Sequence, residues 1–223
     1  MNNHTKLIQF KNLENNQSAI TVIRLMMLCN DLQCANEGLK KSKNSEFKSK
    51  AAGMYFVRIQ IAHLNEGIDI FEKIATDNEL INLLIHCDDE TKKSFDYVKE
   101  NIPKVKKYTA QIRNNIVFHY NDNEKRIKEA ISNILREEPN KTGNVIKGNH
   151  AHLWHFEVAD QIVDNIVVEE IFDIKTSGKK RLEESDRKMQ EIHELLVRYM
   201  DFAGEFICLF FERMPNPPIV KCI

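Results

Sequence analysis

Apolar residues recur along much of the chain at alternating steps of three and four, the spacing that keeps them on one face of a helix. Two such runs are long. The first comprises Met54, Val57, Ile61, Leu64, Ile68 and Phe71. The second comprises Phe95, Val98, Ile102, Val105, Thr109, Ile112 and Ile116, and its next step of three ends on His119. These patterns exclude strands and predict helices that pack at a shallow angle in a bundle.

Further segments complete the series of predicted helices. They are 17–40, 78–86, 91–118, a segment from the polar turn 121–124 to about 137, 153–174 and 182–214. Gly38 and the lysines after it predict the end of the first helix, and three prolines from Pro215 onward end the last one. Pro103 lacks a backbone donor, so we expect a kink or a break in the helix that contains it.

Residues 138–150 form the most loop-like segment, with one proline and two glycines in thirteen positions, and predict a long loop or a small hairpin. The whole chain has only 7 glycines and 5 prolines in 223 residues, which disfavours a turn-rich sandwich or barrel. We therefore predict an all-α, up-and-down helical bundle. A single domain would span 1–223, with a bundle core at 17–137 and a C-terminal helical extension at 151–214.

Charge and cysteine content narrow the class of protein. With 32 basic and 33 acidic side chains, the whole chain has no net attraction for nucleic acid or membrane, so any binding surface must be local. The longest apolar stretch, from Ala19 to Cys29, is interrupted by Arg24 and is too short for a membrane span. Five cysteines without a Cys-x-x-Cys pair predict reduced, mostly buried thiols. We expect a cytoplasmic protein with no membrane partner, cofactor or metal.

A candidate catalytic motif lies at the end of the helix predicted over 91–118, where the chain reads RNNIVFHY at 113–120. The bare spacing of Arg, four to six residues and His is common by chance and also occurs at Arg58–His63 and Arg187–His193. Of the three pairs, only Arg113–His119 has an Asn directly after the Arg and a Tyr directly after the His. The other two pairs lack a polar loop behind the histidine.

These residues resemble the motif of the HEPN superfamily, small helical bundles in which Arg, a polar residue, a short spacer and His form the active site. The resemblance implies metal-independent RNA cleavage by attack of a ribose 2′-hydroxyl on the adjacent phosphate. His119 would act as acid or base, and Arg113 would clamp the charged transition state. Asn114 would support the site by hydrogen bonding. Asn115 lies one turn before His119 and would orient its ring. Tyr120 would pack at the edge of the cleft.

In the family two motif helices commonly meet across a homodimer and build a composite cleft, so we expect the motif at a dimer interface. The resemblance also implies a toxin–antitoxin or antiviral defence system, with a cognate antitoxin or regulatory protein as a further partner. Two alternatives remain open. One is a non-catalytic HEPN-like module that binds RNA, nucleotide or protein, and the other is an unrelated helical interaction protein.

Basic residues lie beside the motif, since residues 91–118 carry seven basic against two acidic side chains. We expect an RNA-binding track on this helix, formed by Lys99, Lys104, Lys106 and Lys107. The alternative is the solvated flank of an amphipathic helix.

Two other clusters have alternative explanations. His150, His152 and His155 around Trp154 suggest a metal site or, with more support, a polar helix start. The segment 157–173 contains six acidic residues and no basic one, and would face the basic helix, a partner or solvent.

Overall fold

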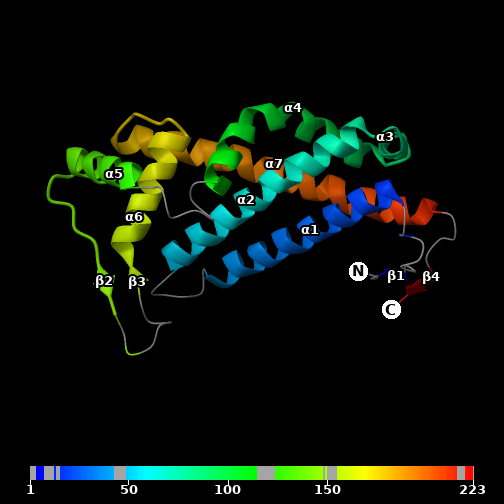
Figure 1. Cartoon of the computed structure of the whole chain (residues 1–223), viewed down its shortest axis with the longest axis horizontal. Coiled ribbons are helices and arrows are strands. Elements are labelled where there is room, and N and C mark those ends of the chain that lie inside the picture. The colour runs from blue at the N-terminus through cyan, green and yellow to red at the C-terminus, as the bar shows by residue number, and fades with distance from the viewer. Residues whose placement is uncertain are drawn as a thin grey trace. The chain divides into compact units, whose positions relative to one another are not determined.

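The chain is all-α, as predicted. A computed structural model describes residues 4–7, 13, 16–42, 49–114, 124–147, 149, 155–214 and 219–222, with the backbone alone at 4–7, 49–52, 155 and 219–222. The helices are α1 (Gln17–Ser42), α2 (Ser49–Thr76), α3 (Asn78–Leu84), α4 (Asp89–Ile112), α5 (Glu124–Glu137), α6 (Glu157–Ile166), the π-helical turn η4 (Val167–Ile171) and α7 (Gly178–Arg213) (Figure 1).

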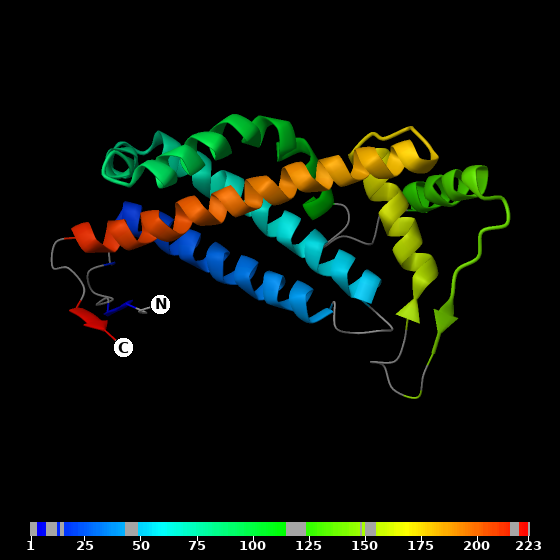
Figure 2. The same ribbon diagram turned by 180° about the vertical axis from the view of Figure 1, so that it is seen from behind.

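Two short antiparallel strand pairs accompany the helices. β1 (His4–Leu7) pairs with β4 (Ile219–Cys222), and β2 (Val145–Ile146) pairs with β3 (His155–Phe156). The first strand of the second pair lies in the segment 138–150, where a long loop or a small hairpin was predicted, but its partner β3 lies beyond that segment, and Figure 2 shows β3 leading directly into α6. The helix predicted from 153 therefore begins only at Glu157.

Two residues were predicted to interrupt helices, Gly38 near the end of the first helix and Pro103 by a kink or a break. α1 continues through Gly38 and ends at Ser42, two residues beyond the predicted end. Gly38 lies against the ring of Phe56, and a Cβ at position 38 would come within 2.3 Å of that ring. Gly38 is thus a packing residue and not a stop signal. At Pro103 the helix does not break, since α4 runs without interruption from Asp89 to Ile112. The other form of that prediction, a kink, stays a prediction.

The chain packs into two compact units. Unit 1 comprises Met1–Leu32, Glu66–Lys104 and Glu194–Ile223, and unit 2 comprises Gln33–Asn65 and Val105–His193. Helices α1, α2, α4 and α7 each contribute residues to both units. The single domain over 1–223 stays a prediction.

The core of unit 1 is aromatic. Phe71 and Phe95 stack with ring centroids 4.7 Å apart, and Phe202 contacts both rings edge-on. The fully buried Tyr199 donates a hydrogen bond of 2.8 Å to the carbonyl of Gly67. A Cβ at Gly67 would come within 2.7 Å of Leu28 and 3.2 Å of the Tyr199 ring, so any larger residue there would require these side chains to shift.

Short polar side chains fix the starts of α3 and α4. Asp77 Oδ1 accepts hydrogen bonds from the backbone N–H groups of Glu79 and Leu80. Asp88 Oδ1 accepts one from the backbone N–H of Thr91. A hydrogen bond from the Thr91 side chain, together with this backbone bond, lowers the pKa of Asp88. Such caps satisfy donors that have no partner inside the helix.

None of the helices in the described part of the chain combines the length with the low charge that a bilayer-spanning segment needs.

Candidate functional site

Arg113 and Asn114 directly follow the last residue of α4. Their backbone continues the helix in a wider, π-type turn, a geometry that is frequent at functional sites. The guanidinium of the half-buried Arg113 donates a hydrogen bond of 2.8 Å from Nη1 to Oδ1 of the exposed Asn114. Two of the predicted site residues therefore contact each other.

The other predicted members of the site, Asn115, His119 and Tyr120, lie outside the described residues. Their roles stay predictions. The apolar run that predicted the position of His119 is confirmed as far as Ile112, because Val105, Thr109 and Ile112 are all buried.

Contacts within unit 2 hold the end of α4 from three sides. Thr109 Oγ1 donates to Oδ1 of Asn65 on α2 at 3.2 Å. The ring of Tyr108 meets that of Phe172, just after η4, edge-on at 5.8 Å. Lys188 on α7 lies 4.8 Å from the centroid of the Tyr108 ring and donates to its hydroxyl at 3.2 Å. The turn that carries Arg113 thus extends from a well-anchored helix.

All four predicted RNA-binding lysines, Lys99, Lys104, Lys106 and Lys107, are exposed on α4. Lys104 donates to Oδ1 of Asn101 at 2.8 Å. Lys99 and Lys104 belong to unit 1, whereas Lys106 and Lys107 belong to unit 2 together with Arg113. The basic residues nearest to the motif in its own unit are therefore Lys106 and Lys107.

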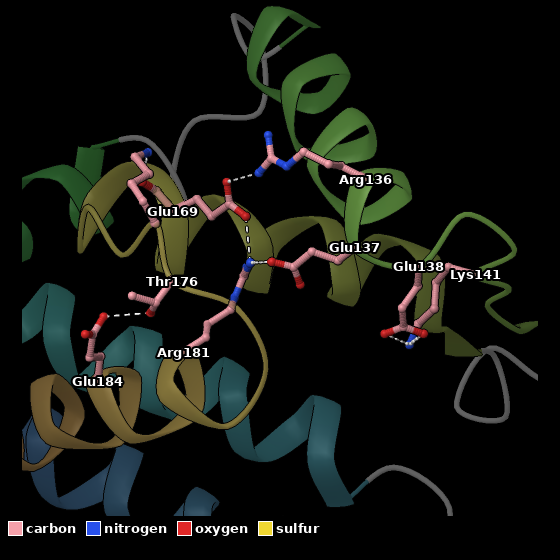
Figure 3. A network of polar contacts seen from close by, with 9 residues as sticks. Arg136, Glu137, Glu138, Lys141, Glu169, Thr176, Arg181 and Glu184 are labelled. Carbon is pink, nitrogen blue, oxygen red and sulfur yellow. Dashed lines mark hydrogen bonds and ion pairs between the residues drawn. The ribbon is translucent and has the colours of Figure 1, made fainter.

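The acidic segment 157–173 is not a plain solvated helix face, because its Glu169 is buried at 3% exposure. Oε1 of Glu169 lies 2.6 Å from Nη1 of Arg181 on α7, and the same nitrogen lies 2.6 Å from Glu137 at the end of α5 (Figure 3). Arg136 approaches the second oxygen of Glu169 at 3.6 Å. This network joins α5, η4 and α7.

Two more arginines pair with the same segment. Arg126 on α5 lies 3.4 Å from Glu170, and Arg58 on α2 lies 3.6 Å from Asp164. Burial raises the pKa of Glu170 and outweighs the opposing effect of the Arg126 guanidinium. The absence of basic residues from 157–173 signals that the compensating cations come from elsewhere, but the sequence does not indicate which arginines supply them.

We expect Glu169→Gln to lower the free energy of unfolding by about 3 kcal/mol, because the largely buried, positively charged Arg181 then keeps only one of its two carboxylate partners. Glu183→Gln is the matched control, since its ion pair with Lys179 is exposed and should contribute less than about 1 kcal/mol. Urea denaturation of the two variants measures the difference. Equal losses would show that the network in Figure 3 has no special weight.

Thiols give little support to nucleophilic chemistry. Burial raises the pKa of both Cys29 and Cys87 to about 11, so these side chains are protonated at neutral pH. Cys34 and Cys208 are exposed, so the prediction of mostly buried thiols holds for only half of the described ones.

No group of three or more potential metal-ligating side chains occurs within the described ranges. His150, His152 and the side chain of His155 lie outside those ranges.

Unit 1 contains a pocket of about 220 Å³ that no prediction anticipated. Leu83 and Phe210 supply buried apolar groups, and Glu79, held by a 2.5 Å hydrogen bond from Ser18, supplies a carboxylate. The remaining lining residues are Asn16, Asn82, His86, Arg213 and Met214. It belongs to a different unit from Arg113.

Comparison of the chain with protein-family models, with curated proteins and with solved structures finds no match in any of the three.

Proposed function

We propose that the chain is a HEPN-like, metal-independent endoribonuclease. The observation that carries the proposal is the hydrogen bond from Arg113 to Asn114, because it joins the two leading residues of the motif at the end of a long, anchored helix. The all-α fold and the exposed Lys106 and Lys107 add support, since they belong to the expected architecture and supply positive charge beside the motif.

In the proposed reaction a ribose 2′-oxygen forms a bond to the adjacent phosphorus while the bond to the 5′-oxygen breaks. His119 exchanges a proton with the attacking or the leaving oxygen. Arg113 presents its planar, permanently charged fork to the oxygens of the crowded phosphorane. The products are a 2′,3′-cyclic phosphate and a 5′-hydroxyl.

The proposed biological setting follows from the same resemblance. The protein would act in the cytoplasm as a homodimer, in a toxin–antitoxin or antiviral defence system, and a cognate antitoxin or regulatory protein would control it. Lys99 and Lys104 lie earlier on α4, farther from the motif, and would contribute to RNA attraction together with Lys106 and Lys107.

The test is incubation of the purified protein with a structured RNA in EDTA, followed by identification of the fragment ends. We expect fragments with cyclic phosphate and 5′-hydroxyl ends. The control is the same RNA with 2′-deoxyribose at the mapped cleavage positions, which lacks the nucleophile and should stay intact. Cleavage of the deoxy-substituted RNA at those positions would contradict the proposed reaction. An uncleaved ribose RNA would contradict the nuclease, and its retention on a filter would then favour the non-catalytic binding module.

A further inference from the structure

The pocket of unit 1 lies where the start of α1, the short helix α3 and the end of α7 come together (Figure 1). We call it the α3 pocket. One wall is a single face of α3 and of the turn after it, with residues three or four apart, namely Glu79, Asn82, Leu83 and His86. A second wall has the same spacing at the end of α7 and consists of Phe210, Arg213 and Met214. The α3 pocket is therefore built by packed helices of one unit.

A carboxylate stands at one end of the α3 pocket. Glu79 lies in the first turn of α3, and its Oε2 accepts the 2.5 Å hydrogen bond from Ser18 on α1. Ser18 is buried, so its hydroxyl holds the carboxylate in a fixed position. A carboxylate accepts hydrogen bonds at both oxygens, and Oε1 can therefore accept one from a ligand.

The guanidinium of Arg213 lies toward the other end of the same wall. Burial raises the pKa of the Cys87 thiol, which directly follows His86, and Arg213 is one of the nearby charges that oppose this rise. Arg213 thus lies near the end of α3, about 10 Å along the helix from Glu79. Among the described side chains, Glu79 is bonded to Ser18 and not to Arg213, so the two opposite charges stay separate.

The part of the α3 pocket between these charges is apolar. Leu83 lies midway along the α3 wall, and both Leu83 and Phe210 are buried. The volume of about 220 Å³ is smaller than the ~300–1,000 Å³ of pockets that hold drug-sized ligands. The α3 pocket therefore suits a small molecule with a cation, an anion and a short apolar part.

We propose that the α3 pocket binds a free amino acid with an apolar side chain. Its ammonium group donates to Glu79, its carboxylate accepts from Arg213, and its side chain packs on Leu83 and Phe210. The ammonium nitrogen and a carboxylate oxygen of an α-amino acid lie ~3 Å apart. A charge-assisted hydrogen bond of ~2.8 Å at each end extends this span to about 8–9 Å. The span is close to the separation of the two charges, which a single ion would leave unbridged.

Isothermal titration of the full chain with L-leucine, L-methionine and L-phenylalanine, at up to about 50 mM, tests the proposal. We expect binding with a Kd on the order of 0.1–1 mM. The comparison ligands are analogues that lack one charged group. For leucine, 4-methylpentanoate lacks the ammonium group and 3-methylbutylamine lacks the carboxylate. Each should bind at least about tenfold more weakly, because it leaves one charged group of the pocket without its partner.

Two variants assign the two charges. Glu79→Gln should weaken leucine binding at least about tenfold and leave 4-methylpentanoate unaffected, since glutamine keeps an oxygen for Ser18 but not the charge. Arg213→Gln should weaken leucine binding and leave 3-methylbutylamine unaffected. The matched controls are Glu90→Gln on α4 and Arg187→Gln on α7, which change exposed charges outside the α3 pocket and should bind like the wild type.

The comparison of ligands requires no variant, so it stays decisive if Glu79→Gln or Arg213→Gln fails to fold. Absence of binding by all three amino acids would overturn the proposal. So would analogues that bind as tightly as the amino acid, or folded charge variants that bind it like the wild type. The α3 pocket belongs to a different unit from Arg113 and its test involves no RNA, so this proposal and the proposed nuclease can fail separately.

Discussion

Phe202→Ala is expected to lower the free energy of unfolding by about 4 kcal/mol, the range found for aromatic truncations in tightly packed cores. Phe202 has no exposed surface, and its ring lies 5.1–6.4 Å from those of Phe71, Phe95, Tyr199 and Phe206. These neighbours come from three helices, so the cavity left by the lost ring cannot close by moving one of them. The variant loses both apolar burial and ring contacts.

The measurement is urea denaturation followed by circular dichroism, with Val197→Ala as the control on the same helix. Val197 is 41% exposed, and its truncation should cost less than about 1 kcal/mol. Phe202→Leu should fall between the two, because it keeps most of the apolar volume but not the ring geometry. Similar losses in Phe202→Ala and Val197→Ala would mean that the aromatic cluster does not form the core of unit 1.

The helices were predictable because burial enforces a strict period. Each position of the run from Phe95 to Ile112 that the pattern places inside is buried in the structure. Pairing across the chain could not be predicted in this way. The four-residue strand β1 pairs with β4 at the opposite end of the sequence, and so short a strand has no distinctive pattern.

Helix ends and ion pairs depended on partners that a local pattern does not contain. Gly38 resembles a stop signal, yet the ring of Phe56 on α2 requires a residue without a Cβ at that point. The acidic segment gave three alternatives from sequence. For Glu169 the structure shows ion pairs within the chain, with Arg136 on α5 and Arg181 on α7, and the local sequence does not indicate either partner.

For the candidate site, the sequence provided the motif, and the structure added the hydrogen bond between Arg113 and Asn114. The spacing of the motif could not predict this bond, because neighbouring residues on a regular helix point about 100° apart. The π-type turn at these two residues departs from that geometry. Such a turn depends on local packing, which a residue pattern does not report.

If the proposed reaction is correct, Arg113→Ala and His119→Ala should each slow RNA cleavage by on the order of 10³-fold or more. Removal of the guanidinium withdraws charge stabilisation from the phosphorane, and removal of the imidazole withdraws proton transfer. Arg113→Lys should still lose about 10²-fold, since an ammonium group keeps the charge but not the fork. Single-turnover cleavage of a labelled RNA measures all three rates.

The chain supplies its own control for these variants. Arg187 and His193 on α7 share the bare spacing of the motif without the following asparagine and are both exposed, so Arg187→Ala and His193→Ala should cleave at the wild-type rate. Asn114→Ala should fall between the two groups, at a loss of about tenfold, because it frees the guanidinium of Arg113 from the hydrogen bond that orients it. Full activity of His119→Ala, or an equal loss in His193→Ala, would remove His119 from the reaction and leave the motif without its acid–base member.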